Sequence, residues 1–83
     1  MYEISELTLL KAIPSTQEAS FREVCNALGD DKPEKGVKGE WGKFFSVLKK
    51  LERDGLVEIS WTGDQVDSLI LTEAGAARVR SGL

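Results

Sequence analysis

Residues 41–75 read WGKFFSVLKKLERDGLVEISWTGDQVDSLILTEAG, and the predicted fold depends mainly on these residues. From about Glu40, apolar residues recur at helical spacing, which predicts an amphipathic helix over residues 40–54. Its apolar side consists of Trp41, Phe44, Leu48 and Leu51, with Phe45 and Val47 at the margins. Gly55 follows and can adopt the left-handed conformation that ends a helix. The stretch therefore begins with one long helix.

A β-hairpin and a last helix are predicted to follow. Residues 56–61 and 66–71 are rich in β-branched, aromatic and other apolar residues, and the turn-forming types of residues 62–64 separate them. Thr72 is placed to cap a helix over residues 73–81. The thin apolar face expected for this helix consists of Ala74, Ala77 and Val79.

The N-terminal part predicts two shorter helices. Apolar residues at near-helical spacing indicate a first helix over residues 3–12, ended by Pro14. Ser20 and Glu23 form a capping-box pair that begins a second helix, and Gly29 is a suitable end. The expected buried face of the second helix consists of Phe21, Val24, Cys25 and Leu28. Most of the chain before residue 40 is thus helical as well.

Residues 29–39, GDDKPEKGVKG, are predicted to form a loop, because they combine three glycines, a proline and mostly charged residues. The resulting order is helix, helix, helix, strand, strand, helix. This is a mainly α fold with a small β-hairpin, in the α+β class. A chain of 83 residues supports one core, so residues 1–83 are expected to form a single domain.

Composition excludes several classes of protein. The sequence has no apolar run of about 18 residues and no signal-peptide pattern, which predicts a soluble cytoplasmic protein without a membrane partner. It has one cysteine and no histidine, so neither a metal nor another cofactor is expected. No nucleophile has an identifiable base partner, and we therefore expect no enzymatic activity.

Charge is segregated along the chain. The formal net charge is -3, but residues 32–53 hold seven basic and three acidic residues, a net charge of +4. The remaining residues hold four basic and eleven acidic residues, a net charge of -7. The predicted helix over residues 40–54 and the loop before it are therefore the basic part of an acidic protein.

The segments LKKLERDGLVEI, residues 48–59, and LTEAGAARV, residues 71–79, resemble winged helix-turn-helix proteins, especially small MarR-like and PadR-like transcriptional regulators. The resemblance implies that the helix over residues 40–54 is a recognition helix that enters the major groove of double-stranded DNA. It also implies that residues 61–67 form the tip of the wing. Members usually have a tight turn before the recognition helix and basic residues in the wing, whereas this chain has the 29–39 loop and the acidic sequence WTGDQVD.

The side of the 40–54 helix opposite the apolar residues is the candidate DNA-binding surface. Its cations are candidates for phosphate contacts, and Ser46 and Lys50 are candidates for base contacts. Lys35 and Lys38 in the preceding loop are candidates for auxiliary backbone contacts. The candidate residues are Lys35, Lys38, Lys43, Ser46, Lys49, Lys50 and Arg53. An ordinary solvated helix surface remains the alternative interpretation of this face.

Protein docking is the competing functional hypothesis, because the winged-helix architecture is also used without DNA. Its candidate contacts are Trp61, Thr62 and Gln65, in an acidic hairpin where an exposed tryptophan suits a protein partner. A small DNA-binding domain also often works as a dimer on a two-fold site. For a homodimer, the candidate surface consists of the face from Ile4 to Leu10 and of Leu83.

Overall fold

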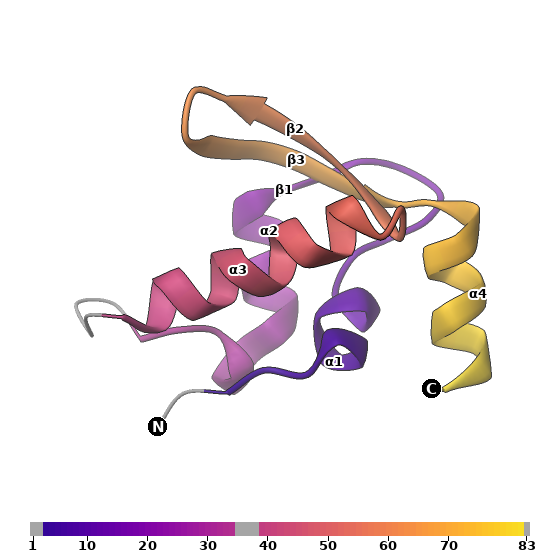
Figure 1. The fold of residues 1–83 in the computed structure, drawn as a ribbon, viewed down its shortest axis with the longest axis horizontal. Coiled ribbons are helices and arrows are strands. Elements are labelled where there is room, and N and C mark those ends of the chain that lie inside the picture. The colour runs from indigo at the N-terminus through magenta and orange to yellow at the C-terminus, as the bar shows by residue number, and fades with distance from the viewer. Residues whose placement is uncertain (1–2, 35–38, 83) are drawn as a thin grey trace.

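The computed structural model describes residues 3–34 and 39–82. It contains four α-helices and a three-stranded antiparallel sheet, which confirms a mixed α and β domain (Figure 1). In chain order the elements are α1 (Glu6–Lys11), β1 (Ala19–Ser20), α2 (Phe21–Leu28), the 3-10 helix η1 (Gly29–Asp31), α3 (Glu40–Arg53), β2 (Val57–Thr62), β3 (Gln65–Leu71) and α4 (Glu73–Ser81). Two of these elements, β1 and η1, were not predicted.

Side-chain caps fix where the helices begin. The Ser20 hydroxyl accepts a hydrogen bond from the Glu23 amide at 3.1 Å, and Thr72 accepts one from the Gly75 amide at 3.1 Å. Both caps were predicted, and each satisfies an amide that has no partner inside the helix. The first helix begins later than expected, at Glu6, because the preceding Ser5 caps it.

The sheet has β3 at its centre, in the order β1, β3, β2. Strands β2 and β3 form the predicted hairpin through the two-residue turn Gly63 and Asp64, with Gly63 at a φ of 60°. On the other edge of β3, Ala19 pairs with Leu69. A strand as short as β1 has no periodicity of its own, so only the fold reveals it.

The core lies between the helices and the sheet. Figure 1 shows the hairpin along one side, with α3 passing in front of α2, and α4 beside α1. Helix α3 contributes the largest fully buried side chain, Phe44. The predicted apolar stripe is confirmed at Phe44, Leu48 and Leu51, whereas Trp41 is only partly buried, as are Phe45 and Val47 at the margins. The buried apolar residues are Leu9, Leu10, Ile13, Ala19, Val24, Leu28, Phe44, Leu48, Leu51, Val57, Val66, Leu69 and Leu71.

Several burial predictions need correction. Cys25 is half-buried and does not belong to the core. Ala74 and Ala77 are exposed, and α4 instead turns Gly75 inward, because only a glycine lets its backbone approach the carbonyl of Leu56. The predicted dimer face is also wrong in part: Leu10 is fully buried in the core of the monomer, as α1 packs against α3 and α4. Leu83 lies outside the described residues.

Candidate nucleic-acid interface

The outer face of α3 carries the predicted cations. Because Phe44, Leu48 and Leu51 are buried, the residues on the opposite side of the helix face solvent. The exposed residues of this outer face are Gly42, Lys43, Ser46, Lys49, Lys50 and Arg53. We refer to these six residues as the α3 face. Five of the seven predicted DNA contacts therefore lie on one surface, whereas Lys35 and Lys38 fall outside the described residues.

Two small residues, Gly42 and Ser46, lie near the start of the α3 face. The Ser46 hydroxyl donates a hydrogen bond of 2.9 Å to the carbonyl oxygen of Gly42, one turn earlier. A methyl group added at Gly42 would meet no atom within 4 Å, so the glycine is not required by packing in the described structure. Helix α3 begins at Glu40 after Gly39, which has a φ of 94°. Lys43 is thus the one cation of the α3 face near the start of the helix, between Gly42 and Ser46, while Lys49, Lys50 and Arg53 lie on its later turns.

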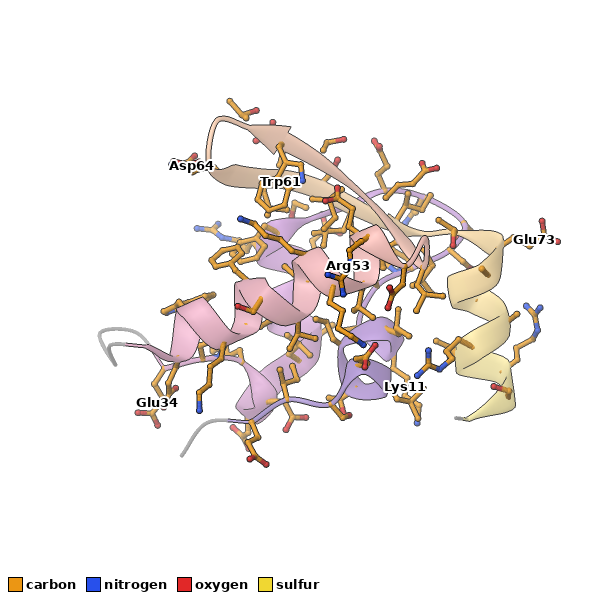
Figure 2. All side chains as sticks on the ribbon, viewed as in Figure 1. Lys11, Glu34, Arg53, Trp61, Asp64 and Glu73 are labelled. Carbon is orange, nitrogen blue, oxygen red and sulfur yellow. The ribbon has the colours of Figure 1, made fainter. Side chains whose placement is uncertain are left out.

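On one flank, α3 is joined to the hairpin through Trp61. The indole N–H of Trp61 donates to a carboxylate oxygen of Glu52 at 3.0 Å, and the Lys49 ammonium lies 5.8 Å from the centre of the indole ring. Both contacts connect β2 with α3, and the second is a cation–π interaction. Figure 2 shows Trp61 on the hairpin beside α3, with Arg53 projecting from the helix. Trp61 therefore orients Lys49 at the edge of the α3 face.

On the other flank, α3 is joined to α1 through Lys50. The Lys50 Nζ atom lies 3.0 Å from Oε2 of Glu6 and 3.7 Å from Oδ2 of Asp54. The neighbouring Arg53 lies 3.9 Å from the other oxygen of Asp54. About half of the Lys50 side chain is exposed, at 48%, against 29% for Glu6. Lys50 is therefore a cation with two carboxylate partners, while the Arg53 side chain is 74% exposed.

The hairpin tip is acidic, as the sequence indicated. Thr62 donates a hydrogen bond to a carboxylate oxygen of Asp67 across the turn, and Gln65 is exposed opposite it. Strands β2 and β3 and their turn contain Glu58, Asp64 and Asp67, and the same segment has no basic residue. Of the three predicted wing contacts, Gln65 has an exposed side chain, whereas the side chains of Trp61 and Thr62 make hydrogen bonds within the chain.

A cluster of four aromatic rings supports the start of α3. Trp41 packs edge-to-face on Phe44 with ring centres 5.7 Å apart, and Phe21 of α2 stacks on Phe45 at 5.7 Å. Trp41 was predicted to lie in the core, but it is only partly buried and packs against the edge of the core. These rings fix α3 against α2 and so determine which side of α3 faces solvent.

Two contacts of the site had no local signal in the sequence. Glu6 and Lys50 are 44 positions apart, and Glu52 and Trp61 are nine positions apart on different elements.

In the described residues, no helix has the length and apolar character needed to cross a membrane, and no group of three or more potential metal ligands gathers. Comparisons with models of protein families, with curated proteins and with solved structures find no match to this chain.

Proposed function

We propose that this chain is a winged-helix protein that binds double-stranded DNA through the α3 face, most simply as a transcriptional regulator. The observation that carries the proposal is the exposed outer face of α3, where Lys43, Lys49, Lys50 and Arg53 gather on the most basic element of an acidic chain. Phosphate contacts from such cations supply most of the sequence-independent affinity for DNA.

The dimensions of α3 support entry into a groove. Its 14 residues make a rod of about 21 Å, and an α-helix fits the major groove of B-DNA. The order of elements supports the same proposal, since α2 and α3 are followed directly by the β2–β3 hairpin and α4. In this arrangement α3 is the recognition helix and the hairpin is the wing.

The residues of the α3 face divide into two proposed roles. Lys43, Lys49 and Arg53 bind phosphates, while Ser46 and Lys50 lie toward the base edges. The acidic hairpin tip would be repelled by phosphates, so we propose that the helix, and not the wing, provides the main contact.

Salt-dependent binding to a duplex tests this proposal. Neutralising two exposed cations in the variant Lys49→Gln/Arg53→Gln removes two phosphate contacts. The slope of log affinity against log salt should then become shallower by about 1.8, at about 0.9 per phosphate. The matched control is Lys11→Gln/Arg80→Gln, which changes the net charge equally at two exposed residues beside a hollow between α1 and α4.

Fluorescence anisotropy with a labelled duplex of mixed sequence measures both slopes between 20 and about 200 mM salt, the range over which counterion release dominates. Wild-type protein that does not bind even at the lowest salt would overturn the proposal. Equal loss of affinity in the α3 variant and in the control would show that only net charge matters, and this result would also contradict a specific α3 interface.

Protein docking at the hairpin is the second candidate function. It is favoured by a hollow of about 530 Å³ between α3 and the hairpin, lined by Phe45 and Trp61 and by two carboxylates, Glu52 and Asp64, against one ammonium group, that of Lys49. Aromatic walls next to negative charge suit a basic segment of a protein partner. If Trp61→Ala loses a protein partner while duplex binding is unchanged, the hairpin and not α3 is the functional surface for that partner.

A further inference from the structure

The cations of the α3 face differ in their ability to bind a phosphate, because Lys50 is paired with carboxylates. Lys50 has the carboxylates of Glu6 and Asp54 at 3.0 and 3.7 Å. Asp54 also lies 3.9 Å from Arg53, so the four connected side chains have no formal net charge. Lys49, by contrast, faces the uncharged ring of Trp61. In that contact no carboxylate compensates the positive charge of Lys49. A phosphate approaching Lys50 would therefore meet the carboxylate of Glu6, and that of Asp54 beside Arg53, as well as the ammonium group.

Glu6 has the geometry to keep this pairing. Its side chain is the less exposed partner, at 29%, and it projects from the first turn of α1, an element anchored by the fully buried Leu9 and Leu10. Displacing Glu6 would thus require moving a carboxylate that the fold holds against α3. Exposed ion pairs are individually weak and Lys50 is exposed, but Glu6 is partly buried and the two residues project from helices that pack on each other.

We propose that Glu6 is a specificity-determining residue of the DNA interface, which pairs with Lys50 and keeps it from adding a phosphate contact to its proposed role at the base edges. This inference rests on the proposed DNA binding through α3. Because phosphate contacts carry no sequence information, removing one of them lowers binding to all duplexes. With one phosphate contact fewer, contacts with base edges make up a larger share of the total affinity. The ratio of specific to non-specific binding therefore rises.

Removing the carboxylate of Glu6 should release Lys50. In Glu6→Gln, affinity for a duplex of mixed sequence should rise about fivefold at 0.15 M salt, the contribution of about one counterion, and the salt slope should steepen by about 0.9. The matched control Glu73→Gln makes the same change in net charge on α4, on the far side of the molecule from the start of α3 (Figure 2). The control should leave the slope unchanged.

A double-mutant cycle separates release of Lys50 from a general charge effect. In the wild-type background Lys50→Gln should change the slope by less than about 0.3, because Glu6 already neutralises the lysine. In the Glu6→Gln background the same change should remove the whole gain of about 0.9. A wild-type slope that becomes shallower by about 0.9 on Lys50→Gln would overturn the inference, and so would an unchanged slope in Glu6→Gln.

The pairing itself can be tested without DNA. Urea unfolding of the two single variants and the double variant should show coupling between Glu6 and Lys50, with the double variant more stable than the sum of the single effects predicts. Coupling without any duplex binding by the wild type would contradict the proposed function while confirming the contact. Duplex binding by the wild type without coupling in either assay would contradict the role of Glu6 alone.

Discussion

Replacing Gly75 with alanine should destabilise the domain, although alanine is the better helix former. Gly75 lies in the first turn of α4, and an added methyl carbon would lie 2.0 Å from the Leu56 carbonyl oxygen and 3.1 Å from a methyl carbon of Leu71. Ordinary contacts begin at 3.4 Å, so α4 and the end of the α3–β2 connection would have to separate by about 1.4 Å. The position therefore accepts only glycine at the observed spacing.

The cost can be worked from what that separation breaks. The Leu56 carbonyl also accepts the amide of Thr72 at 3.1 Å, so moving α4 strains the hydrogen bond that joins its N-cap residue to the α3–β2 connection. Overpacking costs about 1–3 kcal/mol and a lost hydrogen bond about 1 kcal/mol. The higher helix propensity of alanine returns about 1 kcal/mol. We expect Gly75→Ala to lower the free energy of unfolding by about 2 kcal/mol, and Tm by about 8–16 °C.

Gly42→Ala is the matched control, because it makes the same change within α3 at a position where a methyl group meets nothing within 4 Å. It should raise the free energy of unfolding by about 1 kcal/mol, the same gain in helix propensity that was counted for Gly75→Ala. Thermal and urea unfolding followed by circular dichroism measure both variants. If Gly75→Ala were as stable as Gly42→Ala, α4 would not pack against Leu56 in the way described, and the reasoning would be refuted.

Three further predictions concern the cap, the core and the cysteine. Ser20→Ala removes the acceptor for the Glu23 amide and should cost about 1 kcal/mol in urea unfolding, whereas an unchanged midpoint would show that water replaces the cap. Leu48→Ala, at a side chain with 0% exposure, should cost about 3 kcal/mol, and a loss below 1 kcal/mol would contradict its central place in the core. Burial raises the pKa of the Cys25 thiol, opposed by the nearby charge of Lys32, so alkylation at pH 8 should be slower in the folded than in the urea-unfolded protein. Because the thiol ionises at lower pH in the unfolded protein than in the folded protein, the free energy of unfolding should fall as pH rises past the ordinary thiol pKa. Equal alkylation rates in the folded and unfolded protein would contradict the burial of Cys25.

Local sequence signals predicted much of the fold because they act within a few residues. Helical periodicity identified the buried stripe of α3, and capping chemistry identified Ser20 and Thr72, since each depends on spacings of three or four residues. The hairpin followed from turn-forming residues between two apolar runs. These features needed no knowledge of what the elements pack against.

Tertiary contacts account for what the sequence could not predict. The short strand β1 exists because Ala19 meets Leu69 on β3, and α4 turns Gly75 inward because the Leu56 backbone lies there. Periodicity assigned Cys25 to the buried face of α2, but the packing of α2 on its neighbours leaves it half exposed. In each case a position's environment is determined by an element distant in the sequence.

The same distinction applies to the candidate interface. Periodicity placed the cations of α3 on one exposed side, but it treated Lys49 and Lys50 as equivalent neighbours. The fold separates them: Lys49 lies over the ring of Trp61 on the hairpin side, and Lys50 is paired with Glu6 on the α1 side. Because carboxylates border α3 on both flanks, including Glu52 beside Trp61, the strongest attraction for an anion lies along the helix axis. A DNA groove contacts an inserted helix only along a narrow strip of the helix surface, so it would avoid the flanking carboxylates. A broad anionic surface would meet those carboxylates and be repelled, and it therefore suits this arrangement less well.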